Sequence, residues 1–140
     1  MTVLPTHERE ALEEIFATLE RDVAVRLEVG PMETPVALLA AGGRELDTCA
    51  ETRTLVEAVA GVSDRVRLEV IERSEPGAYP ALTIGPGLVY LGLPWGYELA
   101  TLVHGIAAAG RHDSSLQPAT LERLAGLQED VAIDVFVTPT

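Results

Sequence analysis

The chain has 140 residues and a formal net charge of −12, and all ten of its basic residues are arginine. Nucleic acids and anionic membranes bind clustered cations, so this charge speaks against both as partners. Because the chain has no lysine, Schiff-base chemistry and a phosphate-loop lysine are excluded. The single cysteine, Cys49, excludes an intrachain disulfide and a cysteine-based metal cluster within one chain.

No segment has the pattern of a membrane span or of a secretion signal. The apolar runs are too short to cross a bilayer, and no basic region leads into an apolar one near the N-terminus. We therefore expect one cytoplasmic domain, with 47% apolar residues to form its core.

The first half of the chain alternates between helical and strand patterns. Residues 6–20 carry apolar side chains at helical spacing behind a capping threonine, which predicts a helix. Residues 23–29 alternate apolar and other side chains, which predicts a half-buried strand, and residues 36–41 are apolar on both faces, as in a central strand. Asp47 or Thr48 can cap the helix that follows.

The second half contains the clearest local signal. Residues 66–70 alternate as a strand. Two short apolar runs, Ala81–Ile84 and Leu88–Leu91, flank Gly85-Pro86-Gly87, which predicts a β-hairpin. Proline suits the first turn of a helix, so we expect the next helix to run from Pro94 to about Gly110.

A short helix opened by Pro118 and a last strand, Val131–Val137, complete the pattern. The sum is an α/β fold with a mixed sheet. We expect no internal repeat.

Tyr79-Pro80 before the hairpin, and the helix after it, resemble the thioredoxin superfamily, in which a cis-proline takes this place. The segment Gly92-Leu93-Pro94-Trp95-Gly96-Tyr97-Glu98 is similar to the motif G-(L/I/V)-P-x-G-H-E of the glutaredoxin-like protein disulfide oxidoreductases. The related N-terminal domain of the alkyl hydroperoxide reductase flavin subunit shares it, and Tyr97 replaces the histidine. The resemblance covers nearly the whole chain. It implies a thioredoxin-like three-layer fold, a central mixed sheet flanked by helices.

Those proteins carry two such units in tandem, and a strand like Val131–Val137 runs into the C-P-Y-C dithiol of the second unit. The resemblance thus implies a thioredoxin-like domain over residues 1–128 and the start of a second unit over residues 129–140. The chain is then a fragment, or a protein that has lost its second half. The alternative is an ordinary edge strand that ends a complete domain.

Cys49-Ala50-Glu51-Thr52 lies where the redox motif C-x-x-C of such a unit belongs. A helix N-terminus stabilises a thiolate, although the neighbouring Glu51 opposes it. Because Thr52 replaces the second cysteine, only monothiol exchange remains, with glutathione or with a protein thiol or disulfide. The alternative is that Cys49 is an inert remnant or a small buried side chain.

Tyr79, Pro80 and Thr52 are the substrate-binding residues that the resemblance implies beside the catalytic Cys49. A thiol and the ledge that holds its substrate must face one site, so we expect Cys49 within about 10 Å of Pro80. The Tyr79–Pro80 bond is expected to be cis. We expect no metal and no cofactor, because no histidines pair as ligands and no nucleotide-binding or serine-nucleophile motif is present.

Two functions follow. The first is the unit of a thiol–disulfide oxidoreductase or peroxide-reducing electron-transfer system, with monothiol activity at most. The second is a redox-inactive module that docks partners or dimerises. A glutaredoxin that shares an iron–sulfur cluster is disfavoured, since its C-G-F-S is absent. The apolar strand Val131–Val137 predicts a homodimer, because an unpaired edge promotes association.

Overall fold

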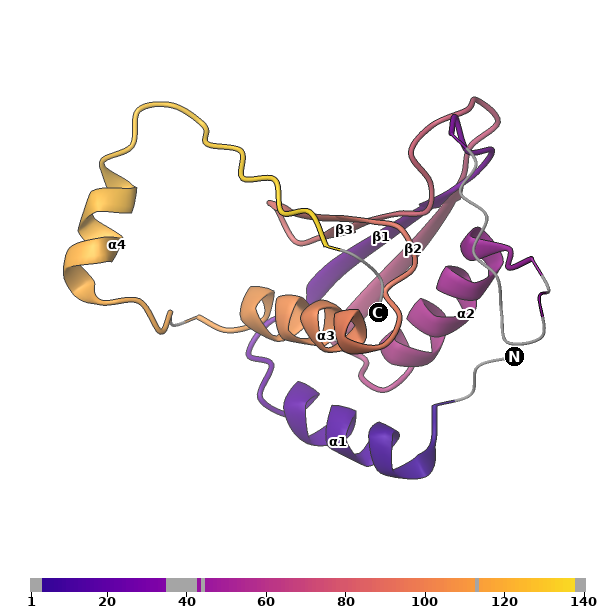
Figure 1. Cartoon of the computed structure of the whole chain (residues 1–140). Coiled ribbons are helices and arrows are strands. Elements are labelled where there is room, and N and C mark those ends of the chain that lie inside the picture. Colours follow the sequence, from indigo (N-terminus) through magenta and orange to yellow (C-terminus); the bar gives the residue numbers. More distant parts are fainter. Residues whose placement is uncertain (1–3, 35–42, 44, 113, 138–140) are drawn as a thin grey trace.

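The structure, a computed structural model, describes residues 4–34, 43, 45–112 and 114–137. The expected strand at residues 36–41 lies outside them. The elements, in chain order, are α1 (Thr6–Phe16), β1 (Val23–Val29), α2 (Thr48–Ala60), β2 (Val66–Glu72), β3 (Ala81–Ile84), β4 (Leu88–Leu91), α3 (Tyr97–Ala109) and α4 (Pro118–Ala125) (Figure 1).

The four strands form one mixed sheet in the order β2-β1-β3-β4. β1 pairs with β2 in parallel and with β3 antiparallel, and β3 and β4 form the expected hairpin. Gly85 opens the hairpin turn with φ +56°, a left-handed conformation that glycine adopts without a Cβ penalty. The α/β class, the mixed sheet and the hairpin are confirmed.

One face of the sheet carries the core. Val23, Val25 and Leu27 point to this face from β1 and are buried, whereas Ala24 and Arg26 between them are exposed. Helices α1, α2 and α3 all pack on the buried face in a single cluster (Figure 1). Their largest contributions are Leu12 and Phe16 of α1, Val56 and Val59 of α2, and Leu102, Val103 and Ile106 of α3. A fully buried side chain of this kind contributes about 1.5–3 kcal/mol.

The opposite face of the sheet is polar where β1 meets β2. Arg26 pairs with Glu69 across the two strands, and Arg67 pairs with Asp22. The described residues therefore build a sheet and one helical layer. The second helical layer that a three-layer fold implies is not among them.

Two helices differ in length from the expectation. α1 ends at Phe16 and not near Glu20, although Leu19 beyond its end is still buried. α3 begins at Tyr97 and not at Pro94, because Gly96 has φ +62°, which interrupts a right-handed helix.

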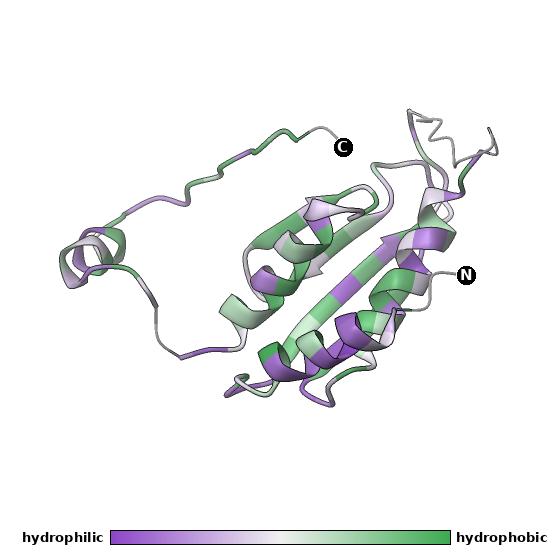
Figure 2. Cartoon of the chain, turned by 60° about the horizontal axis from the view of Figure 1, so that its bottom comes forward, coloured by the Kyte–Doolittle hydropathy of each residue, from purple (hydrophilic) through white to green (hydrophobic). Residues whose placement is uncertain are grey.

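We call residues 114–137, after α3, the C-terminal arm (Figure 2). Its helix α4 lies away from the sheet, and the chain then runs back toward the domain, so that Val137 lines a hollow together with Pro80 and Glu98. Helix α4 buries no residue. The expected strand Val131–Val137 is not formed, and Ile133 and Phe136 are 82% and 94% exposed. A strand needs a hydrogen-bonded neighbour, and among the described residues the arm has none. Within the described part of the chain, no helix is long and apolar enough to cross a membrane.

Candidate functional site

The Tyr79–Pro80 peptide bond is cis, as the sequence predicted. The segment before it is held against the end of β1, where Gly77 donates to the carbonyl of Pro31 and accepts from the N–H of Glu33. The ring of Tyr79 packs over Gly77, and a Cβ at this glycine would lie 2.9 Å from ring atoms. This contact explains why a glycine stands in the polar loop. It fixes Tyr79 and Pro80 at the start of β3.

Helix α2 begins at the same end of the sheet, where β1 ends and β3 begins. The carboxylate of Asp47 accepts from the N–H of Ala50 at 3.0 Å and caps the helix. Thr48 is therefore the first helical residue and Cys49 the second. Consecutive helical residues point about 100° apart, so the two side chains face different surroundings.

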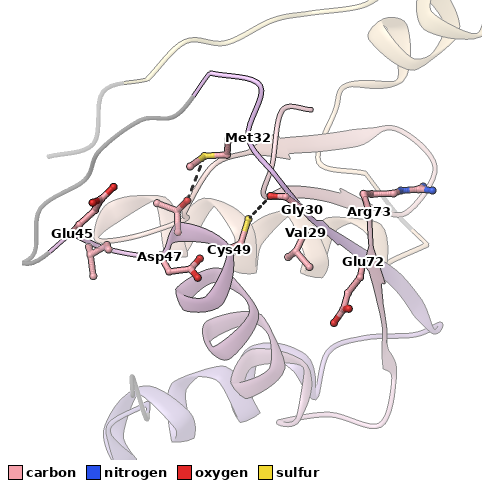
Figure 3. Close-up of a pocket in the computed structure, with 10 residues that line it drawn as sticks. Val29, Gly30, Met32, Glu45, Asp47, Cys49, Glu72 and Arg73 are labelled. Carbon is pink, nitrogen blue, oxygen red and sulfur yellow. Dashed lines mark hydrogen bonds between the residues drawn. The ribbon is translucent and has the colours of Figure 1, made fainter. Parts of the chain in front are cut away.

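Cys49 faces the ends of β1 and β2. Its Sγ lies 3.7 Å from the carbonyl oxygen of Gly30 (Figure 3). The thiol is half-buried and lines a hollow of about 640 Å³, which we call the thiol hollow. Its other lining residues include Val29, Met32, Glu45, Asp47, Thr48, Glu72 and Arg73.

Pro80 lines a different, smaller hollow of about 210 Å³, which we call the proline hollow. The residue of α2 that lines this hollow is Thr48 and not Cys49. The thiol turns toward Gly30, and the two hollows share Met32 and Thr48, so a common site for Cys49 and Pro80 stays a prediction. Thr48 is only 5% exposed, and its hydroxyl donates to the Sδ of Met32 at 3.8 Å.

Thr52, expected at the substrate site, lies in the core instead. Its side chain is 0% exposed, and its Oγ1 has no hydrogen-bond partner among the described residues. It lines none of the hollows at this edge. The site therefore combines Cys49, Tyr79 and Pro80 of the predicted residues with Thr48 and Met32, which sequence reasoning missed.

Sequence reasoning also missed an acid at the proline hollow. Glu98, in the first turn of α3, accepts a hydrogen bond from the Tyr90 hydroxyl at 2.5 Å, and both line this hollow. Burial raises the pKa of Tyr90 well above its ordinary value, and the hydrogen bond to Glu98 adds to the effect. The glutamate of the Gly92–Glu98 motif was the available signal, because it recurs in the resembled family.

Three hollows at this edge share Met32. The third, of about 270 Å³, runs past Glu33, Gly77, Tyr79 and Leu91. We call the lining of these three hollows together the Met32 groove. Among the described residues, no group of three His, Cys, Asp or Glu side chains could hold a metal ion.

No protein-family model and no curated protein sequence matches the chain. Solved structures match its fold. The alkylhydroperoxide reductase protein AhpF of Enterococcus faecalis, in a mutant form, superposes with a TM-score of 0.69 at 18% identity, covering 90% of this chain and 62% of that one. The NTD_N/C domain of the same reductase gives 0.68 at 19% identity, with 90% and 62% coverage. A protein disulfide oxidoreductase from Aeropyrum pernix gives 0.70 at 22% identity, with 91% and 56% coverage.

These similarities establish a thioredoxin-like fold and confirm the resemblance seen in the sequence. The chain spans less than two thirds of each of these three structures.

Proposed function

We propose that this domain is a unit of a thiol–disulfide redox system and that its Met32 groove receives an extended segment of a partner protein. One observation carries the proposal: Thr48, Tyr79 and Pro80 meet in a hollow at the end of the sheet that shares Met32 with two further hollows. The named activities of the structural neighbours, an alkylhydroperoxide reductase and a disulfide oxidoreductase, supply the redox context. The N–H of Tyr79 already donates to Gly77, so the segment would be received through the Tyr79 carbonyl and side-chain contacts.

A thiol placed at position 48 tests this docking directly. In a Cys49→Ser background, Thr48→Cys would carry the only sulfhydryl, in the hollow that Pro80 lines. For each variant, the rate of mixed-disulfide formation with a peptide disulfide is divided by the rate with a small neutral disulfide reagent. We expect this ratio to be higher for Thr48→Cys than for Ala50→Cys in the same background. Ala50 is the matched control because it lies in the same helical turn and is exposed. Equal relative rates at the two positions would refute docking beside Pro80.

Monothiol exchange at Cys49 is the second candidate, favoured by the half-buried thiol that lines the thiol hollow at the start of α2. The Cys49 thiolate would attack a partner disulfide, so that a new S–S bond forms as the old one breaks. The released partner sulfur leaves as a thiolate and takes a proton from water. Cys49 is oxidised and that sulfur is reduced.

Mass spectrometry of the wild-type chain and of Cys49→Ser, after incubation with a peptide disulfide or glutathione disulfide, tests this chemistry. We expect an adduct on the wild type alone. A Cys49 that reacts no faster than the same thiol in the unfolded chain would leave docking as the sole function.

We further propose that the C-terminal arm begins a second thioredoxin-like unit, with residues 129–137 as its first strand. Two short similarities between the start and the end of the chain support this, although no internal repeat was expected. The segment Asp22-Val23-Ala24-Val25 of β1 returns as Asp130-Val131-Ala132-Ile133, and Leu12-Glu13 of α1 returns as Leu121-Glu122 of α4. The buried residues of β1 thus have exposed apolar counterparts in the arm. Such a strand requires a partner, which a second copy of the chain can also supply, as a homodimer.

A further inference from the structure

The edge of the domain that carries the Met32 groove is acidic. Glu45, Asp47 and Glu72 line the thiol hollow (Figure 3). Glu98 lines the proline hollow, and Glu33 lines the third. Each part of the groove thus presents at least one carboxylate. The hollow on the open face of the sheet differs, because it is lined by two arginines, Arg26 and Arg67, with Glu69.

Among the described residues that line the groove, Arg73 is the one basic residue. Its charge is neutralised by an ion pair with Glu28. Arg53, on the flank, is shared between Glu57 and Glu72, at 3.0 and 3.2 Å. The described lining residues of the groove therefore carry a net negative charge, in a chain whose total charge is −12.

From this charge we infer that the segment bound in the Met32 groove is cationic, an extended stretch of a partner protein rich in lysine or arginine, and that glutathione is a poor ligand. The inference rests on the proposed docking function and names its partner class. Opposite charges across an interface speed encounter and suppress wrong partners, whereas like charges are repelled. Glutathione carries more carboxylates than ammonium groups, so its charge has the wrong sign for this groove.

The contacts of such a segment follow from the lining residues. Lysine and arginine side chains would lie near Glu33 in the third hollow and near Glu98 in the proline hollow, while Tyr79, Leu91 and Met32 contact their aliphatic stems. Exposed ion pairs contribute modestly, so removing one carboxylate should weaken binding by about 1.5- to 5-fold. Specificity would come from the sum of several carboxylates.

Two labelled peptides of the same length and apolar content, one flanked by lysines and one by glutamates, test the inference by fluorescence anisotropy with the full chain at low and physiological salt. We expect the lysine peptide to bind and the glutamate peptide not to bind, with binding weakened by salt. Glu33→Gln together with Glu98→Gln should weaken the lysine peptide by about 2- to 25-fold, the product of two single effects. The control pair Glu10→Gln and Glu14→Gln on α1 removes the same charge from an exposed helix face and should change binding little.

The outcomes separate the inference from the function beneath it. If both peptides bind equally, docking stands and the cationic preference is refuted. If the α1 pair weakens binding as much as the groove pair does, the effect belongs to total charge, and the groove assignment is refuted. If neither peptide binds at low salt, the docking function itself fails. Reduced glutathione added as competitor should displace the lysine peptide no better than a neutral tripeptide, and efficient displacement would overturn the second half of the inference.

Discussion

Thr48 and Pro80 line the same hollow, and Thr48 takes this place because the carboxylate of Asp47 caps α2 one residue earlier. The cap fixes the first helical residue, and with it the direction in which each side chain of the first turn points. Placing the start one residue later would rotate Cys49 into the position that Thr48 holds. The chemistry at this edge therefore depends on a single capping hydrogen bond.

Removing that cap should destabilise the domain. We expect Asp47→Ala to lower the free energy of unfolding by about 1 kcal/mol, because the Ala50 N–H loses its acceptor. Asp47→Asn keeps a capping oxygen and should stay close to wild type. Urea denaturation measures both variants. A loss in Asp47→Asn equal to that in Asp47→Ala would show that charge at the helix N-terminus, and not the cap, carries the effect.

The start of α2 also shows where sequence reasoning stopped. Asp47 and Thr48 are both good capping residues, so the sequence left the helix start open by one residue, and that residue decides which side chain meets Pro80. The hairpin was predictable because Gly85-Pro86-Gly87 is a local signal. The place of Thr48 beside Pro80 could not be predicted, because it depends on how α2 packs against the sheet. The strand Val131–Val137 was predicted from alternation alone, but a strand forms only when a neighbouring strand is available.

Two glycines, one within α3 and one at its C-terminal end, should respond to alanine in opposite directions. A Cβ at Gly110 would lie 2.3 Å from Cδ2 of Leu19 and 3.0 Å from Cγ2 of Val23, both in the core, so Gly110→Ala should cost about 1–3 kcal/mol. At Gly105 a Cβ would meet ordinary contacts at 3.4 and 3.5 Å. Gly105→Ala should therefore stabilise the helix by up to about 1 kcal/mol. Chemical denaturation of the two variants compares them, and a stabilised Gly110→Ala would contradict the packing described here.

The hydrogen bond from Tyr90 to Glu98 predicts a dependence of stability on pH. The pKa of Tyr90 is raised in the folded state, so the folded chain holds this proton more tightly than the unfolded chain. The stabilisation is complete below the ordinary tyrosine pKa of about 10 and is lost as pH rises above it. Tyr90→Phe should cost about 1 kcal/mol near neutral pH, and its difference from wild type should shrink above about pH 10.

Tyr97→Phe is the matched control, because Tyr97 is 88% exposed and carries no side-chain hydrogen bond among those described. Unfolding by urea at a series of alkaline pH values measures both differences. A Tyr90→Phe difference that stays constant through this range would show that the hydroxyl titrates as it does in the unfolded chain.

The last prediction concerns the C-terminal arm, whose exposed apolar side chains should drive association. Val131, Ile133 and Val135 stand at every second position of the arm, as their counterparts do on β1, where they are buried in the core. Phe136 is not docked on the domain, so local docking does not relieve this exposure. An extended apolar segment with free backbone groups pairs readily with another strand. We expect a homodimer, or association that rises with concentration, through Val131–Val137.

Light scattering should show this association for the 140-residue chain and not for a chain that ends at Gln128. Ile133→Asp should abolish it, while Ala132→Asp, which adds the same charge on the other side, should weaken it less. A full chain that stays monomeric at high concentration, or a shortened chain that associates equally well, would exclude the arm as the contact.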